Sequence, residues 1–212
     1  MYIPKHFEGD EITGREIMQA HGWSLLITAD EAGAPVCTHL AMVWEEDPGP
    51  GGSPHGSLLG HIARANDHWK LFSRPVDSLA LFWGPHAYVS PTWYTPGPKV
   101  PTWNYVTVHA YGRPTIVEAT PAVLMVLTKL SKIYEGSGAD AWGLGRLPPG
   151  NAAEQTKHIV AFRMKLDRVE TKLKLSQNRD LEDRHRVIDK LASSDSQDAQ
   201  ATAKWMKRVL PQ

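Results

Sequence analysis

The sequence predicts a mainly β protein whose strands form a closed or split barrel, accompanied by a few helices. Six or more short β-like segments are separated by turns that contain glycine or proline, as in antiparallel sheets. One clear helix lies between strands, whereas a parallel sheet requires a helix in every crossover. At 212 residues the chain is long enough for one well-buried core.

The N-terminal part is expected to form a short helix followed by a β-hairpin. Asp10 is a typical N-cap, so the helix is expected over residues 11–21. Residues 23–29 and 36–44 have strand-like composition, and Gly33 between them can adopt the positive φ of a tight turn.

The middle of the chain alternates between strands and turns. Residues 45–56 are rich in proline and glycine and are expected to form a loop. A helical turn is expected over residues 62–66, with Asn66 at its end, and a turn at Gly112 is expected to separate two strands. The strands expected here are 57–61, 78–83, 87–91, 104–112 and 114–119.

Residues 119–135 form the clearest expected helix. Val123, Leu127 and Leu130 fall on one face, together with Leu124 and Tyr134, which indicates a helix packed on the core. The last expected elements are one long strand and two polar helices, at residues 158–176, 180–192 and 197–210.

Composition restricts the classes of partner. The 23 basic and 23 acidic residues balance, so the overall charge does not attract nucleic acid or an anionic membrane. The single cysteine, Cys37, excludes an internal disulfide framework and fits a reducing cytoplasm. The N-terminus lacks the apolar core of a signal peptide, and the longest apolar run, residues 122–127, is too short to span a bilayer. A soluble cytoplasmic protein is therefore expected.

Residues 84–112 are unusually rich in aromatic side chains and nearly free of charge. Four of the six tyrosines, Tyr88, Tyr94, Tyr105 and Tyr111, lie in this stretch together with two tryptophans. Tyrosine and tryptophan bury a flat apolar face while they still donate a hydrogen bond. The stretch therefore predicts a surface that contacts a planar ligand or another subunit.

Two polar clusters are candidates for ligand contacts. His61 and Arg64, beside the expected helical turn, suggest an anion site built from backbone amides and a cation. The alternative is an ordinary turn whose arginine points into solvent. The second cluster, Lys174, Ser176 and Gln177, ends the long strand, and helix capping nearby explains part of it.

Other polar residues carry weaker signals. Thr38 and His39 face opposite sides of a strand, and a lone histidine there is more often structural. The Asn104 amide offers both a donor and an acceptor, which can match the edge of a heterocycle. The ten histidines show no zinc-type spacing, so no metal site is expected, and no dinucleotide, Walker or nucleophile-elbow motif is present.

Six segments in order along the chain resemble the signature blocks of the PaiB-type FMN-binding negative transcriptional regulators. The segments are MYIPKHF, THLAM, GHIARAN, GPHAYVSPTWY, VPTWNY and KLSQNR, and they span roughly residues 1 to 190. The chain departs from the family at Ala41 and Asp67, where proline is more common. Neither departure removes a polar contact.

The resemblance implies a six-stranded antiparallel FMN-binding split barrel that forms a homodimer, with one FMN at each end of the subunit interface. It implies a split-barrel domain over residues 1–190 and a C-terminal helical extension, 191–212, packed on the barrel or on the partner. The FMN contacts that it implies, taken with the polar clusters above, are Thr38, His39, His61, Arg64, Ser90, Trp93, Thr102, Trp103, Asn104, Lys174, Ser176 and Gln177.

Two functions compete at this stage, a transcriptional regulator and a flavin-dependent reductase or oxidase that acts on a small or flat substrate. A plain flavin store is a third. No catalytic residue is identified, and a flavin carries most of its own chemistry. Direct DNA binding is expected to be weak or indirect, because the basic residues Lys204, Lys207 and Arg208 share a short helix with an apolar face.

Overall fold

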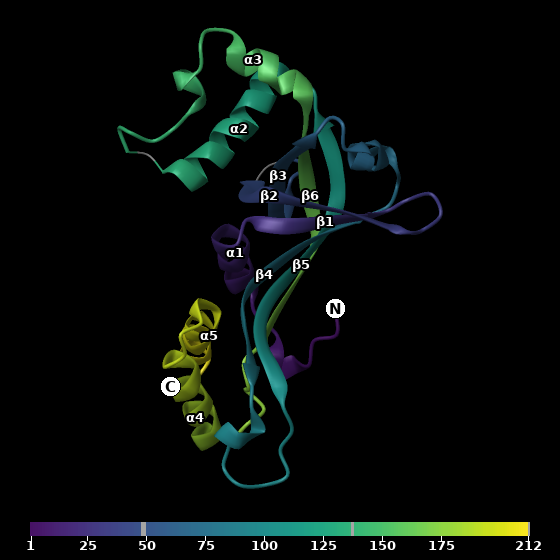
Figure 1. Cartoon of the computed structure of the whole chain (residues 1–212). Coiled ribbons are helices and arrows are strands. Elements are labelled where there is room, and N and C mark those ends of the chain that lie inside the picture. Colours follow the sequence, from purple (N-terminus) through teal and green to yellow (C-terminus); the bar gives the residue numbers. More distant parts are fainter. Residues whose placement is uncertain (48–49, 137, 212) are drawn as a thin grey trace. The chain divides into compact units, whose positions relative to one another are not determined.

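The computed structural model describes residues 1–47, 50–136 and 138–211. Six antiparallel strands form one sheet, closed into a barrel in the order β1-β2-β3-β6-β5-β4 (Figure 1), which confirms the predicted fold class. The strands are β1 (Trp23–Ala29), β2 (Pro35–Asp47), β3 (Ser53–Ala63), β4 (Ser78–Val89), β5 (Thr102–Val117) and β6 (Ile159–Lys174). The α-helices are α1 (Glu11–Ala20), α2 (Thr120–Glu135), α3 (Asn151–Gln155), α4 (Leu181–Ala192) and α5 (Gln197–Arg208).

The chain divides into two compact units. The first unit contains Met1–Ala20, Trp83–Val108 and Glu170–Gln212, and the second contains His21–Phe82 and His109–Val169. Strands β4, β5 and β6 therefore contribute to both units. The boundary predicted between residues 190 and 191 stays a prediction.

The N-terminal elements follow the sequence closely. The Asp10 carboxylate accepts a hydrogen bond from the Thr13 amide at 2.7 Å and so caps α1 as predicted. Gly33 has a φ of +84° in the turn between β1 and β2, which confirms the predicted hairpin.

Strands β2 and β3 extend further into the Pro/Gly segment than predicted. β2 continues to Asp47 and β3 begins at Ser53, and these two residues pair across a register shift that starts at Glu45. Only part of the expected loop over 45–56 is therefore a loop, and residues 48–49 of it lie outside the described residues.

The helical turn predicted over residues 62–66 is wrong. β3 continues to Ala63, and the helical segment is a 3₁₀ helix at Asp67–Ser73. Asn66 begins this helix instead of ending one, because its side chain accepts a hydrogen bond from the His68 amide at 3.1 Å. The amides of the helix start therefore follow Arg64 by several residues.

β4 and β5 are each one long strand where the sequence analysis expected two. β4 passes through Gly84 and Pro85, and β5 passes through Gly112 without a turn. A Cβ on Gly112 would lie 1.9 Å from the Lys165 carbonyl oxygen of β6. Gly112 thus allows the backbone of β6 to approach closely, which is a common reason for a glycine inside a strand.

Helix α2 covers part of the sheet in the second unit. Its residues Val123, Val126 and Leu130 are buried and form a core with residues of β2, β3 and β6, namely Val43, Leu59 and Ala161. Leu127 packs at the edge of this core, whereas Tyr134 is exposed. The predicted apolar face is therefore correct at its centre and wrong at Tyr134.

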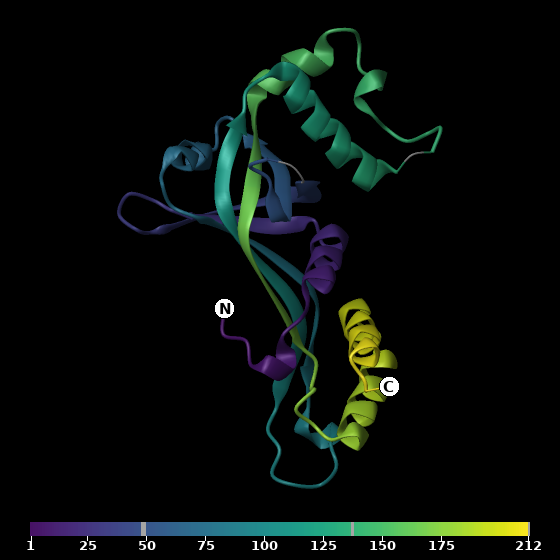
Figure 2. The same ribbon diagram turned by 180° about the vertical axis from the view of Figure 1, so that it is seen from behind.

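Helices α4 and α5 form an antiparallel pair in the first unit, and both views show them side by side (Figures 1 and 2). α5 buries Ala199, Thr202, Ala203 and Met206. The Met206 sulfur lies 3.3 Å from the Asn104 amide nitrogen, so α5 docks on β5 of its own chain.

Candidate functional site

The first unit carries an exposed aromatic face on β4 and β5, made of Trp83, His86, Tyr88 and Trp103. Trp83, Tyr88 and Trp103 are 37%, 46% and 53% exposed. The Trp103 ring centroid lies 6.2 Å from that of His86 and 5.9 Å from that of Tyr88. His86 and Tyr88 share one face of β4 because they lie two residues apart. Trp83 is three residues from His86, and it reaches the same face because the alternation of β4 shifts at Gly84 and Pro85, which are both buried.

Two shallow hollows adjoin the aromatic face. One has a volume of about 310 Å³ and lies over Trp83, Trp103 and Tyr105. The other has a volume of about 460 Å³ and lies between Trp103, Trp93 and the α4–α5 pair. Both volumes fall in the range of roughly 300–1,000 Å³ that is typical of small-molecule sites.

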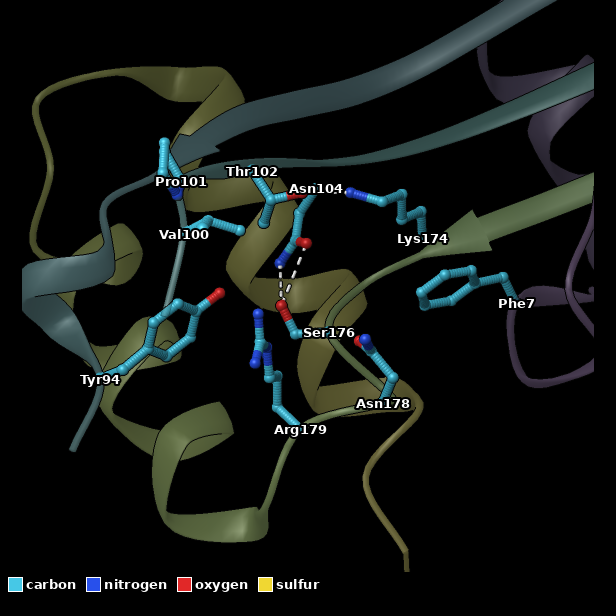
Figure 3. Close-up of a pocket in the computed structure, with 10 residues that line it drawn as sticks. All are labelled: Phe7, Tyr94, Val100, Pro101, Thr102, Asn104, Lys174, Ser176, Asn178 and Arg179. Carbon is cyan, nitrogen blue, oxygen red and sulfur yellow. Dashed lines mark hydrogen bonds between the residues drawn. The ribbon is translucent and has the colours of Figure 1, made fainter. Parts of the chain in front are cut away.

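A smaller polar cavity of about 130 Å³ lies in the same unit (Figure 3). Its walls come from the start of β5, the end of β6 and the segments that flank them, together with the 3₁₀ helix Lys5–Phe7. Its lining residues are Phe7, Tyr94, Val100, Pro101, Thr102, Asn104, Lys174, Ser176, Asn178 and Arg179. We call the space that these residues line the polar cavity.

Lys174 joins two of the predicted contacts directly. Its ammonium donates hydrogen bonds to the Thr102 hydroxyl and to the Trp103 carbonyl oxygen, each at 2.5 Å. Burial lowers the pKa of the Lys174 ammonium, and the positive charges of Lys172 and Arg179 lower it further. The cavity is therefore a place where positive charge accumulates.

Asn104 and Ser176 form a second pair among the predicted contacts. The Asn104 amide nitrogen donates to the Ser176 hydroxyl at 3.0 Å, and this hydroxyl lies 3.1 Å from the Asn104 amide oxygen (Figure 3). Asn104 is fully buried. Ser176 has a φ of +65°, an uncommon conformation for a residue other than glycine, and such strain concentrates at functional sites.

Asp183 of α4 anchors the segment between β4 and β5. Its buried carboxylate accepts hydrogen bonds from the Thr95 amide at 2.7 Å and the Thr95 hydroxyl at 2.9 Å, and it pairs with Lys99. Burial alone would raise the pKa of Asp183, but the hydrogen bonds from Lys99 and Thr95 hold it below its ordinary value. This anchor positions the segment that supplies Tyr94, Val100 and Pro101 to the polar cavity.

The remaining predicted contacts of the first unit have local roles. Ser90 caps the 3₁₀ helix Pro91–Trp93 through a hydrogen bond from the Thr92 amide at 3.2 Å. Gln177 folds back on its own strand, where it accepts from the Leu175 amide and donates to the Leu173 carbonyl oxygen.

Thr38, His39, His61 and Arg64 lie in the second unit. Arg64 donates hydrogen bonds at 2.8 Å to the carbonyl oxygens of Lys157 and Ile159. His39 is exposed and stacks with Trp23 at a centroid distance of 6.4 Å.

His61 is the one member of this group with a buried nitrogen, Nδ1, that lacks a hydrogen-bond partner in the described part of the chain. Burial lowers the pKa of the His61 imidazole.

Thr38 belongs to a buried polar network that the sequence did not reveal. Its hydroxyl lies 2.8 Å from His68 Nδ1 and accepts a hydrogen bond from the side-chain nitrogen Nδ2 of Asn66 at 3.1 Å. His68 Nε2 lies 2.9 Å from the Thr28 hydroxyl, which is 2.6 Å from that of Ser78. Burial lowers the pKa of His68. The network fixes the orientation of Thr38.

Sequence reasoning also did not assign Tyr94 and Arg179 to a site. Tyr94 lies within the aromatic stretch, and Arg179 ends the polar segment 172–179, where it was expected to open a helix, so the sequence held a signal for both. Their convergence depends on the segment 94–101, whose path is set by the distant Asp183. That contact could not be read from local spacing.

In the described part of the chain, every helix is too short or too polar to span a bilayer. No group of three or more His, Cys, Asp or Glu side chains there is arranged to hold a metal ion.

Comparison with known proteins identifies relatives over the whole chain. The family model "Putative FMN-binding domain" matches residues 1–168. The protein PAI 2 of Bacillus subtilis (strain 168), named "Protease synthase and sporulation protein PAI 2", is 32% identical over 214 residues, which cover 99% of this chain and 98% of that protein. An uncharacterized protein of Saccharomyces cerevisiae is 30% identical over 139 residues, covering 55% of this chain and 79% of that protein.

Solved structures share the fold at low sequence identity. The flavocytochrome Anf3 from Azotobacter vinelandii has a TM-score of 0.61 at 15% identity, with 83% of this chain and 73% of that chain covered. The FAD and heme binding protein from Mycobacterium smegmatis has a TM-score of 0.60 at 11% identity, with 83% and 77% covered. The family model and the full-length relative together show that the chain belongs to the PaiB-type family of FMN-binding domains and binds FMN.

Proposed function

We propose that this FMN-binding protein is a cytoplasmic homodimer that acts as a negative regulator of transcription. The observation that carries the proposal is the full-length similarity to PAI 2, whose name connects that protein with protease synthesis and sporulation. Cys37 is exposed and single, which suits a reducing compartment.

The residues of the chain fit a flavin mononucleotide in their chemistry. FMN combines a flat ring system with a negatively charged phosphate, and the first unit offers an aromatic face together with cations and amide donors. We assign the contacts predicted from the sequence to FMN as part of this proposal: Thr38, His39, His61, Arg64, Ser90, Trp93, Thr102, Trp103, Asn104, Lys174, Ser176 and Gln177. The bound flavin would supply redox chemistry, and the chain would orient it.

The aromatic face also supports the proposed homodimer. Exposed apolar patches of more than a few hundred Å² usually mark interfaces, and tryptophan and tyrosine are enriched in interface cores. Trp83, Tyr88 and Trp103 are exposed on one face, so a second copy of the chain would bury rings that a monomer leaves in water. We also propose that the chain consists of a split-barrel domain over residues 1–190 and a helical extension over residues 191–212.

The basic residues of α5 favour weak or indirect association with DNA. Arg208 already pairs with Glu16 at 2.7 Å and lies over the Trp205 ring, which leaves Lys204 and Lys207 for phosphates. Few phosphate contacts give low affinity and a shallow dependence on salt.

The regulatory role can be tested by measuring transcripts genome-wide in three strains. One strain carries the wild-type gene, one lacks the gene, and one carries Trp103→Ala, which removes a ring of the aromatic face. Transcripts repressed by the wild type should rise in both altered strains. Identical transcript levels in all three strains would contradict a regulatory role.

A flavin-dependent reductase or oxidase is the second candidate. The hollow of about 310 Å³ beside Trp83 and Trp103 favours it, because an open aromatic surface can accept a second flat molecule. Oxidation of NADH or NADPH by the FMN-loaded protein, faster than by free FMN at the same concentration, would support this role. Equal rates would favour the regulator.

A further inference from the structure

We propose that the polar cavity of the first unit is an oxyanion site, which binds a carboxylate or a phosphate group. The proposal rests on the charge of the cavity wall, on one unpartnered hydroxyl and on the volume available. It concerns other residues than His61 and Arg64 of the second unit, which the sequence suggested as an anion site.

The wall of the cavity is positively charged and carries no carboxylate. Lys174 and Arg179 line it, and among its described lining residues no Asp or Glu is present to balance them. Lys172 lies close enough to influence Lys174. Asp183, a buried carboxylate of the same unit, is already engaged by Lys99 and Thr95. A ligand carrying negative charge would supply the missing balance.

Tyr94 provides an independent sign of a ligand. Its side chain is 4% exposed, and its hydroxyl is buried without a hydrogen-bond partner among the described residues. A buried hydroxyl without a partner costs free energy, so native proteins rarely retain one without a reason. Figure 3 shows this hydroxyl directed into the cavity, toward the same space as the Arg179 guanidinium.

The donors of the cavity suit an oxyanion. The Arg179 guanidinium lies 5.0 Å from the centre of the Tyr94 ring and presents a planar fork that matches carboxylate and phosphate oxygens. Lys174 uses two of its three protons on Thr102 and Trp103, and the third remains for a ligand. The Asn178 amide adds a further donor to the wall.

The volume of the cavity sets an upper limit on the group that enters. About 130 Å³ is far more than the roughly 10–15 Å³ that one water needs, yet it is too small for a whole flavin. The cavity therefore suits one oxyanion group. That group is either the phosphate of FMN or a separate small anion, and the first of these sources rests on the proposed FMN site.

The test uses two variants and a matched control in the full-length protein. Arg179→Gln removes the charge, and Tyr94→Phe removes only the unpartnered hydroxyl. Arg186→Gln removes an equivalent charge from the exposed surface of α4, where Arg186 pairs with Glu182. Binding of inorganic phosphate to the flavin-free protein is measured by calorimetry, and binding of FMN and of riboflavin by flavin fluorescence.

Two results would support the proposal and identify the source of the anion. If FMN supplies it, both variants should bind FMN about 10- to 100-fold more weakly and riboflavin as the wild type does, as expected for the loss of a charge-assisted hydrogen bond. If the anion is separate, both variants should bind phosphate at least about 10-fold more weakly, with unchanged FMN affinity. Arg186→Gln should behave as the wild type in either case.

Other results would overturn it. If both variants bind phosphate and FMN with the affinity of the wild type, the polar cavity is not an oxyanion site. A lower melting temperature of Tyr94→Phe in the absence of ligand would lead to the same conclusion, because it would show that the hydroxyl is already bonded within the protein. The phosphate measurement needs no flavin, so failure of the proposed FMN contacts and failure of the oxyanion site give different results.

Discussion

Arg64 is the residue that tests the anion site suggested in the second unit and its proposed contact with FMN. Arg64→Ala should weaken FMN binding by about 1.5–3 kcal/mol, the range for a hydrogen bond to a charged group. Because Arg64 also donates to the Lys157 and Ile159 carbonyls, thermal unfolding must first confirm that the variant is folded. The dissociation constant is then measured by flavin fluorescence, with the exposed Arg186→Ala as control. An unchanged constant would remove Arg64 from the site.

His61 and His68 predict how stability depends on pH. Burial lowers both pKa values in the folded chain below the ordinary value near 6.5. The unfolded chain therefore binds more protons at mildly acidic pH. The contribution of the two neutral histidines to the free energy of unfolding should be fully present above about pH 6.5. It should fall as the pH drops toward the lowered pKa values, by at most about 1.4 kcal/mol per pH unit for each proton.

Urea unfolding at pH 7.5 and 5.5 checks this dependence. The wild type should be less stable at pH 5.5, and His68→Gln should lose less stability between the two pH values than the wild type does. Equal free energies of unfolding for the wild type at both pH values would contradict the prediction.

Single residues differ in how far the sequence reveals their roles. Asp10 and Gly33 were predictable because a cap and a tight turn depend on neighbouring residues alone. Asn66 was placed at the wrong end of a helix, because Asn suits both ends of one. Tyr94 could not be assigned, since its unpartnered hydroxyl depends on packing between distant segments.

At the level of elements, the contact between α4 and the β4–β5 segment should contribute strongly to stability. Asp183 is 1% exposed, and its removal leaves the Thr95 amide without its acceptor and the Lys99 ammonium without its counter-charge, with the Thr95 hydroxyl as the remaining partner of Lys99. Asp183→Ala should therefore cost about 3–5 kcal/mol of unfolding free energy, measured by urea denaturation.

The neighbouring acidic residue of the same helix provides the control. Glu182 pairs with Arg186 at 2.9 Å on the exposed surface, so Glu182→Ala should cost at most about 0.5 kcal/mol. Similar losses for the two variants would show that the buried pair does not anchor the segment.

The sequence predicted the type of most elements but not the length of the strands. β6 was predicted to within two residues at each end, because no glycine or proline interrupts its strand-like run. β4 and β5 were each divided in two, because Gly84, Pro85 and Gly112 are usual signs of a turn. In this barrel these residues lie within strands, and at Gly112 the reason is the approach of β6, a contact far away in the sequence.

For the molecule as a whole, the aromatic face predicts a homodimer. Light scattering of the FMN-loaded protein at micromolar concentration should give about twice the chain mass of 23.6 kDa, because pairing buries the exposed rings. A monomeric mass under these conditions would contradict the proposed assembly and would leave the aromatic face to the flavin alone.

The central claim is that the chain binds FMN, and a titration of the purified protein with FMN tests it most directly. Added protein should quench the flavin fluorescence and shift the visible absorption bands, with saturation at one FMN for each chain. FAD should compete poorly, because the sequence contains no dinucleotide-binding motif. A free-flavin spectrum that persists at saturating protein concentration would contradict the account.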